Sequence, residues 1–392
     1  MLKPLTKRLL PLYIAKFLRN FIFWYAIEKL FMTTIGYTDA TIGVMAGVYS
    51  IMSVAMEVPS GILADRWSRK GVMILSAVCM VLSSYIGWVS YSVPMFLVSA
   101  IFWGFFDALA SGTDSAMLYD TVLEEQGHTD NYEKISGRFE AIGGLALIAS
   151  AVIGGLIGDH LTLRYAFLLS VIPATLAIIS LLFYKETKFH KQSADTHIIA
   201  HTKGTFKAVL RNPNLIWLLV TMLALSTINS LNGELYQLWY LALRPPATLY
   251  GIAGAIILGT YGTGGLFTSH LASKRRIFMS LLIIFAAGFA LIISRTLIIT
   301  VIAQFMIGFI SFALGLVLMA QVQRQLPSKY RAGAGSVINS VARLIFIPTV
   351  LLFGYVSDAV SVFTASWILV ILGAIGIYSE LRAKILRQST SV

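Results

Sequence analysis

A short charged segment lies between two long apolar stretches near the start of the chain. It runs from Gly61 to Lys70 and reads Gly-Ile-Leu-Ala-Asp-Arg-Trp-Ser-Arg-Lys. On each side lie roughly 20 apolar residues, which as a helix rising 1.5 Å per residue are long enough to cross a bilayer. A connection this short leaves no room for a soluble domain, so the flanking helices are predicted to be antiparallel neighbours. Its three cations belong on the cytoplasmic side of a membrane.

The composition agrees with a polytopic membrane protein. Of 392 residues, 57% are hydrophobic and 12% are charged, with a mean hydropathy of +0.79. A soluble domain carries about 25% charged residues, so a large soluble core is a poor explanation. The net charge of +12 is explained by cations in cytoplasmic loops, and no nucleic-acid partner is predicted. Cys79 is the one cysteine and excludes an internal disulfide.

The sequence predicts an all-α membrane protein with twelve transmembrane helices. The apolar spans lie at about 10–33, 41–60, 71–90, 94–117, 139–158, 164–184, 213–238, 248–270, 277–294, 296–318, 334–356 and 360–379. Of the 30 Lys and Arg residues, 23 fall on one side, 3 on the other and four inside spans. Both termini are therefore predicted to be cytoplasmic. The first span is too long for a cleavable signal peptide, and none is predicted.

The spans fall into two groups of six. The longest polar stretch, 185–212, reads as a cytoplasmic linker between bundles at 1–184 and 213–392. The two halves also repeat each other, because Leu63–Arg66 (Leu-Ala-Asp-Arg) is matched by Leu271–Lys274 (Leu-Ala-Ser-Lys) at an offset of 208 residues. The second copy lacks the aspartate. The chain is therefore predicted to be an internal duplication.

The charged segment resembles the loop between helices 2 and 3 of the major facilitator superfamily, a family of secondary transporters. Ser68 stands where that family usually has glycine. Residues 57–61, 111–120 and 327–333 resemble one bacterial permease branch, which is similar to drug/proton antiporters. The resemblance implies two pseudo-symmetric six-helix halves, a mid-membrane substrate site and alternating access. It also implies a monomer in the bacterial inner membrane.

The resemblance further implies a gating role for the charged segment. In the family, this loop latches the cytoplasmic face of the first half to the eleventh helix in the outward-facing state. The residues that match this gating loop are Gly61, Asp65, Arg66, Arg69 and Lys70.

Polar residues follow helical spacing in the first and fourth spans. Lys16, Asn20, Trp24 and Glu28 recur every four residues, and Trp103, Asp107, Ser111 and Asp114 recur at four, four and three. Each set is predicted to lie along one helix face. Two such stripes, each with an aromatic residue, are typical of a water-lined cavity. The candidate cavity residues here are Asn20, Trp24, Trp103 and Ser111.

Ionisable residues inside spans are the candidates for proton coupling, since a charge at the bilayer centre costs roughly 2.5 kcal/mol or more. Asp107 is the first choice because it lies mid-span, where the membrane interior favours the protonated form of a carboxylic acid. Glu28 is the second choice, and Glu234 is a third candidate. The alternatives are structural: Asp107 pairs with Arg19, Glu28 pairs with Lys29, and Glu234 is interfacial.

The second half offers further cavity candidates. Asn229 and Asn232 lie on the seventh span, and Asn339 and Arg343 lie on the eleventh. Arg343 is interpreted in two ways, either as a cation that meets an anionic substrate group or as a partner of Glu234.

These features predict a proton-coupled secondary transporter that moves a small molecule through the lipid bilayer. Export of an amphipathic drug-like compound is the first hypothesis, and uptake of a polar or anionic nutrient by proton symport is the alternative. Two departures from drug/proton antiporters count against export: the fifth span has Gly154, Gly155 and Gly158 but no Gly-Pro pair, and the fourth lacks a mid-helix arginine. Tight helix packing explains those glycines equally well.

Other function classes receive little support from the sequence. All six histidines fall in loops or at span ends, so neither an embedded enzyme nor a metal site is predicted. No phosphate-binding Gly-x-x-x-x-Gly-Lys sequence occurs, so no nucleotide cofactor is predicted either. A non-transporting sensor stays open as an alternative, and a measurement of substrate flux separates it from a transporter.

Overall fold

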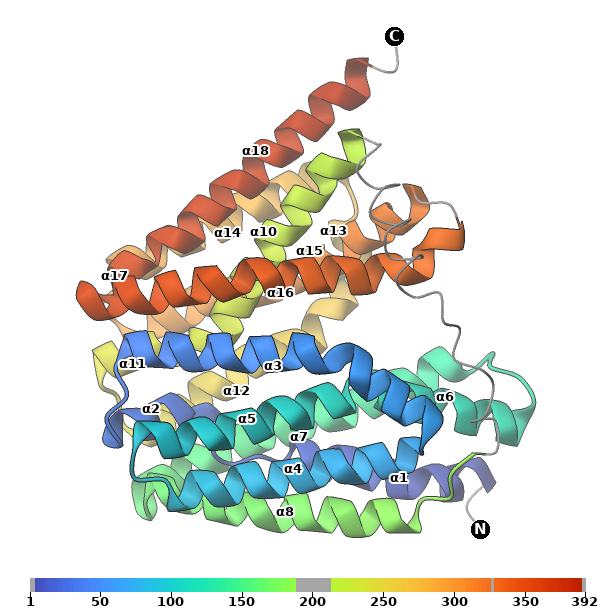
Figure 1. Ribbon diagram of the computed structural model, residues 1–392. Coiled ribbons are helices and arrows are strands. Elements are labelled where there is room, and N and C mark those ends of the chain that lie inside the picture. The colour runs from blue at the N-terminus through green and yellow to red at the C-terminus, as the bar shows by residue number, and fades with distance from the viewer. Residues whose placement is uncertain (1–3, 188–212, 326–327, 390–392) are drawn as a thin grey trace. The chain divides into compact units, whose positions relative to one another are not determined.

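The fold is helical, as the sequence predicts. In the computed structural model, which describes residues 4–187, 213–325 and 328–389, nearly every residue is helical and none of those described forms a β-strand (Figure 1). Within these described ranges, ten segments are long and apolar enough to cross a membrane, and Ala247–Thr260 is a shorter apolar helix. The all-α membrane fold is therefore confirmed, while the count of twelve spans stays a prediction.

Each predicted span corresponds to one helix or a series of helices. The first half contains α1 (Pro4–Asn20), η1 (Tyr25–Ile27), α2 (Glu28–Thr34), α3 (Asp39–Arg66), α4 (Arg69–Val89), α5 (Val93–Ala110), α6 (Thr113–Gln126), α7 (Tyr132–His160) and α8 (Leu163–Phe183). The second contains α10 (Pro213–Leu235), α11 (Gln237–Leu243), α12 (Ala247–Thr263), η3 (Gly264–Phe267), α13 (Thr268–Leu271), α14 (Lys274–Ile293), α15 (Leu297–Gln325), α16 (Ser328–Ala359), α17 (Val362–Ala365) and α18 (Trp367–Ser389).

Several predicted spans are interrupted. The first stops at Asn20 and resumes as a 3-10 turn at Tyr25, and the seventh is divided at Tyr236. The fourth is divided at Ser111 and Gly112, where Gly112 has φ +75°. Residues with a Cβ rarely adopt this backbone conformation, so the glycine allows the chain to turn there. Broken helices inside a membrane leave backbone groups for other partners and often line transport sites.

The helices group into two compact units. Unit 1 comprises Met1–Tyr37, Val48–Ala194 and Pro245–Leu258, and unit 2 comprises Thr38–Gly47, Asp195–Arg244 and Gly259–Val392. Each unit thus includes a short segment from the other predicted half. Residues 188–212 of the predicted linker lie outside the described residues. The boundaries predicted at 184 and 213 stay predictions.

Close glycine contacts explain these two exchanged segments. In unit 1, a Cβ on Gly155 of α7 would lie 2.9 Å from the Cα of Gly251 of α12. In unit 2, a Cβ on Gly43 of α3 would lie 3.1 Å from the Cα of Gly354 of α16. The backbones touch because no side chain separates them. Gly43 and Gly251 are 208 residues apart, the same offset as the repeated loop motif.

A carboxylate accompanies each of these glycine contacts. The Asp159 carboxylate accepts hydrogen bonds from the backbone N–H groups of Ala247 and Thr248 at 2.8 and 2.7 Å, at the start of α12. In unit 2, the Ser357 hydroxyl donates to Asp39 at the start of α3. Negative charge is favourable at a helix N-terminus, so Asp159 stabilises the position of α12 against α7.

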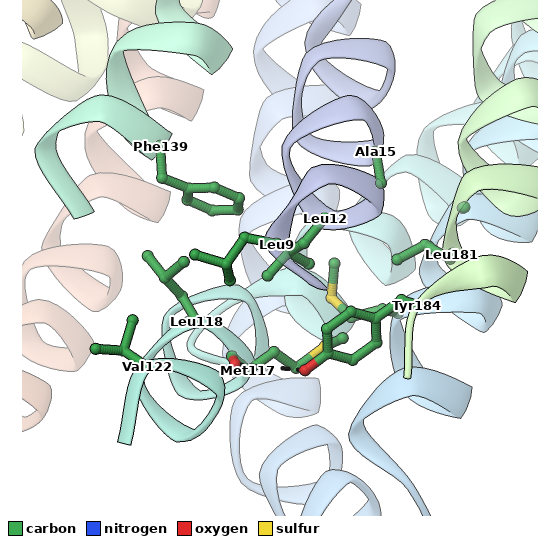
Figure 2. Close-up of a cluster of buried hydrophobic side chains, with 11 residues drawn as sticks. Leu9, Leu12, Ala15, Met117, Leu118, Val122, Phe139, Leu181 and Tyr184 are labelled. Carbon is green, nitrogen blue, oxygen red and sulfur yellow. Dashed lines mark hydrogen bonds between the residues drawn. The ribbon is translucent and has the colours of Figure 1, made fainter. Parts of the chain in front are cut away.

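Within unit 1, helices α4, α5 and α8 lie side by side, and α1 packs against α7 and α8 (Figure 1). Figure 2 shows the buried apolar cluster that joins α1 to α6 and α7. Leu9 and Leu12 of α1 contact this cluster together with Met117 of α6 and Phe139 of α7. Tyr184, just beyond α8, is 2.7 Å from the Thr121 hydroxyl. This core holds α1 and α6 in fixed register beside the charged residues described next.

Candidate functional site

Unit 1 contains a cluster of charged side chains on α1, α6 and α7. Arg19 Nη1 donates a hydrogen bond to Asp114 Oδ1 at 2.9 Å. Lys16, one turn earlier on α1, places Nζ 3.5 Å from Asp114 Oδ2 and 3.0 Å from Glu140 Oε1. Asp114 lies in the first turn of α6, where the helix dipole favours a negative charge. Two cations and two carboxylates therefore meet among three helices.

Burial makes the Arg19–Asp114 pair the most constrained part of this cluster. The side chain of Arg19 is 4% exposed and that of Asp114 is 13% exposed, whereas Glu140 is 60% exposed. Removing one partner of a buried pair leaves an uncompensated charge, which is strongly unfavourable.

Asp107 has neutral partners instead. The hydroxyls of Tyr49 and Ser53 on α3 lie 2.9 and 3.4 Å from its Oδ2. Among the described residues, no cation pairs with this carboxylate. The sequence-based alternative that paired Asp107 with Arg19 is wrong, because Arg19 binds Asp114. Asp107 and Asp114 therefore differ in their partners, which are neutral hydroxyls for Asp107 and two cations for Asp114.

The predicted polar stripes are not continuous helix faces. The fourth span turns at Gly112, so Asp114 is on α6 while Trp103 and Asp107 are on α5. Ser111 is exposed at this break, and Trp103 is half-buried. The prediction of one face through Asp114 is therefore wrong, since it assumed an unbroken helix.

The stripe in the first span is broken as well. Helix α1 ends at Asn20, whose side-chain amide donates to the Lys16 carbonyl at 2.8 Å. Trp24 is 2% exposed, stacks on Phe167 and donates to the Ser84 hydroxyl at 3.1 Å. Trp24 therefore packs in the interior of unit 1, and its role as a cavity residue stays a prediction.

Gly154 is required where the first span is broken. A Cβ added to it would lie 1.8 Å from the Phe23 carbonyl oxygen. A Cβ on Gly158 would lie 2.9 Å from that of Ala247. With the Gly155 contact, this confirms the packing interpretation of the glycines in the fifth span.

Glu28 forms the pair that the structural alternative predicted. Lys29 Nζ donates to Glu28 Oε2 at 2.7 Å, and both residues are buried. Tyr37, in the connection that follows α2, is also buried and donates to the Val93 carbonyl at 3.0 Å. Burial is the main cause that raises the pKa of Tyr37, and the negative charge of Glu28 adds to it. Glu28 therefore has a cationic partner, whereas the partners of Asp107 are neutral hydroxyls.

Unit 2 contains a buried amide cluster at the break between α10 and α11. The side chain of Gln304, on α15, donates to the Tyr236 carbonyl at 3.1 Å and accepts from the Tyr240 hydroxyl at 2.7 Å. Asn232 donates to the Gln304 carbonyl at 3.1 Å. The Asn232 side-chain oxygen is buried and has no hydrogen-bond partner in the described part of the chain. Asn229, one turn earlier, accepts from Ser311 of α15 at 3.1 Å.

Sequence reasoning missed Gln304, since a single glutamine in an apolar span forms no stripe. The other candidates in unit 2 lie on α10 and α16. Glu234 and Arg343 are half-buried and both have interaction partners, while Asn339 is exposed. Neither interpretation of Arg343 is decided by these positions.

The predicted gating loop is tied to unit 1 by carboxylates. Arg69 pairs with Asp120 of α6 and, at 3.5 Å, with Asp65. The Ser68 hydroxyl accepts from the Gly71 N–H at the start of α4 and lies 2.8 Å from a carboxylate oxygen of Glu186. Serine therefore caps α4 at the position where glycine is usual.

Other members of this loop have smaller roles in unit 1. Lys70 donates to the Leu182 carbonyl at 2.8 Å, while Gly61 and Arg66 are exposed. The partners Asp120 and Glu186 could not be found from the sequence, because they lie 51 and 118 positions away from Arg69 and Ser68 along the chain. The latch to the eleventh helix stays a prediction.

Comparison with known proteins decides the family. The sequence profile of the Major Facilitator Superfamily matches residues 9–347. The chain belongs to this superfamily. A crystal structure of the nucleoside transporter NupG superposes with a TM-score of 0.76, at 14% identity over 98% of this chain and 99% of that one. At this identity the likeness shows that the two chains share the superfamily fold.

Two curated relatives are also transport proteins. The inner membrane transport protein YajR of Escherichia coli is 25% identical over 64% of this chain and 54% of its own length. The class H tetracycline resistance protein of Pasteurella multocida is 29% identical over 37% of this chain and 35% of its own length. The matched regions thus span about half and about a third of these relatives. This superfamily member is a multi-pass membrane protein.

Proposed function

We propose that this superfamily member is a proton-coupled transporter that exports an amphipathic compound across the bacterial inner membrane by alternating access. The observation that carries the proposal is the contrast between two carboxylates of the fourth span. Asp107 contacts hydroxyls, whereas Asp114 binds Arg19. Asp107 is therefore the proton carrier in this proposal, and Asp114 keeps the nearby guanidinium away from it.

Export is supported by the tetracycline resistance relative and by aromatic side chains beside the charged residues. Trp103 packs against Phe106 with ring centroids 4.7 Å apart, and Arg19 lies 5.2 Å from the Phe106 ring centroid. Flat apolar surfaces beside a few charges suit an amphipathic compound. Tetracycline is therefore the first compound to test.

A second candidate function is uptake of an anionic nutrient by proton symport. Arg19 and Lys16 support it, because protonation of Asp114 would leave these two cations with one largely solvated carboxylate. A proton and an anion would then bind together and move in the same direction. In an exporter driven by proton exchange, the proton and the transported compound would instead compete for binding.

The direction of flux in inside-out membrane vesicles tests the proposal. With an acidic lumen, the vesicles should accumulate an exported compound, and a proton ionophore should abolish the accumulation. Vesicles from cells that lack the protein provide the control. Accumulation only in right-side-out vesicles with an acidic exterior would favour symport instead.

The proposed orientation places both termini and the 185–212 linker in the cytoplasm, and the transporter is proposed to act as a monomer. Two of the three cations on the outer side have backbone carbonyl partners. Arg164 donates to the Trp88 carbonyl at 2.7 Å, and Arg295 donates to the Ile292 carbonyl at 2.8 Å. Arg244 forms the end of α11. Cations at helix C-termini are favourable, which explains these exceptions to the cation distribution.

A further inference from the structure

Charge is distributed unevenly along the chain. Only Glu234, Asp358 and Glu380 of the 18 acidic residues lie beyond residue 212, and residues 235–357 contain none. Twelve of the 30 Lys and Arg residues lie beyond the same point. Cations in this part of the sequence therefore have few carboxylates with which to pair.

The consequence is clearest where the loop motif repeats. In unit 1, Arg69 at the start of α4 pairs with Asp65 and Asp120. In the second copy, Ser273 replaces Asp65, and Lys274, Arg275 and Arg276 begin α14.

All three of these cations are exposed. The side chain of Arg276 donates to the neutral Ser273 hydroxyl at 2.7 Å, and no carboxylate among the described residues pairs with any of the three. Three positive charges in the first turn of a helix also repel its dipole, so the described part of the chain does not neutralise this cluster.

Helix α18 adds a fourth cation at the same level. It packs antiparallel against α14: Cβ atoms added to Gly288 and Gly376 would meet Val370 and Leu281 at 3.1 and 3.4 Å. Gly376 of α18 faces Leu281 of α14. Six residues further along α18 and six residues back along α14, Arg382 lies level with Arg275. Arg382 is exposed and contacts the Tyr378 hydroxyl at 2.8 Å. The nearest acidic residue in sequence, Glu380, is 6% exposed.

Apolar side chains follow the cations along each helix. On α14, Met279 and Ile283 are 49% and 40% exposed, one and two turns after Arg275. On α18, Tyr378 and Ile375 are 50% and 42% exposed, one and two turns before Arg382. An unneutralised basic end followed by exposed apolar surface matches the two parts of a phospholipid, its headgroup and its acyl chains.

We propose that Lys274, Arg275, Arg276 and Arg382 form a binding surface for the phosphate headgroup of an anionic phospholipid, whose acyl chains cover the exposed stripes of α14 and α18. The corresponding loop of unit 1 differs, because its Arg69 pairs with the carboxylates of Asp65 and Asp120. The inference is independent of which compound the transporter carries.

Lipid binding to the purified full-length protein tests this inference. Native mass spectrometry in detergent would compare dioleoyl phosphatidylglycerol with dioleoyl phosphatidylcholine for the wild type and for Lys274→Gln/Arg275→Gln/Arg276→Gln. Each cation near an anionic lipid surface contributes roughly fivefold in affinity, so the triple variant should bind phosphatidylglycerol about a hundredfold more weakly. Binding of phosphatidylcholine should not change.

The matched control is Lys7→Gln/Lys134→Gln/Arg138→Gln, which removes three exposed cations elsewhere in the chain. It should leave phosphatidylglycerol binding nearly unchanged. Equal losses in both triple variants would overturn the proposal, because binding would then depend on net charge alone. Equal affinity of the wild type for both lipids would also overturn it. If millimolar inorganic phosphate displaces bound phosphatidylglycerol as strongly as added phosphatidylglycerol does, the surface would be assigned to a free anion instead.

Discussion

Arg19 and Asp114 form a buried ion pair 2.9 Å long between α1 and α6. Because Asp114 is in the first turn of α6, the pair fixes the position of the broken fourth span against the first. Asp107 contacts hydroxyls instead of this arginine. The proposed division of roles between the two carboxylates rests on this geometry.

The pair should be strongly coupled in stability. Asp114→Asn leaves Arg19 buried without a counter-charge and should destabilise the protein by roughly 3–5 kcal/mol. Replacement of both partners by apolar residues, as in Arg19→Met/Asp114→Leu, should recover much of this loss. Thermal unfolding in detergent measures the effect for the single and double variants. Additive losses in the double variant would show that the two side chains do not depend on each other.

The glycine contact between α7 and α12 should tolerate no added methyl group. Gly155→Ala would place a Cβ 2.7 Å from the Ala247 carbonyl oxygen and should lower the unfolding temperature. Gly144→Ala on the same helix is the matched control, because a Cβ there meets nothing within 4 Å. The control should be neutral or slightly stabilising, since alanine favours helix more than glycine does. If both variants unfold at the same temperature, the close packing of these helices is wrong.

Much of this architecture could be predicted from the sequence, since apolar length and cation position are local signals. The predicted spans correspond to helices, and the repeated loop motif showed that the second copy has no aspartate at Ser273. The helix breaks could not be predicted, because the intervals from Lys16 to Glu28 and from Trp103 to Asp114 fit an unbroken helix equally well. The turn at Gly112 depends on a backbone conformation that spacing does not reveal.

Partners from distant helices were also beyond sequence reasoning. The Arg19–Asp114 pair joins residues 95 positions apart, and the Asn232–Gln304 contact joins residues 72 apart. Both depend on how α1 packs against α6 and how α10 packs against α15. Composition identifies such residues as unusual in a membrane, and only the packing shows which of them meet.

The loop at the start of α4 yields a prediction about gating. Asp120 and Asp65 both pair with Arg69, but Asp120 is the more buried, with its side chain 15% exposed against 48%. Asp65→Asn should slow turnover with little change in substrate affinity, because the latch biases two nearly equal states. Asp120→Asn should have the larger effect. Spectroscopic distances across the cytoplasmic face would measure the shift, and distances that match the wild type in both variants would exclude a gating role.

Topology offers an independent prediction. The cation distribution predicts that the linker and both termini lie in the cytoplasm. In a Cys79→Ala background, a cysteine at Ser193 should react with an impermeant thiol reagent only after the cells are opened. Labelling of this cysteine from outside intact cells would show that the linker lies outside, which contradicts the predicted orientation.

Transport in proteoliposomes with an imposed pH gradient tests the central claim, which is proton coupling through Asp107. Wild-type protein should accumulate its substrate, with tetracycline as the first compound of the panel, only while the gradient persists. Asp107→Asn should abolish this accumulation and retain downhill exchange, which also shows that the variant is folded. Glu28→Gln should still accumulate substrate. Accumulation by Asp107→Asn at the wild-type level, together with its loss in Glu28→Gln, would contradict the account and assign the proton to Glu28.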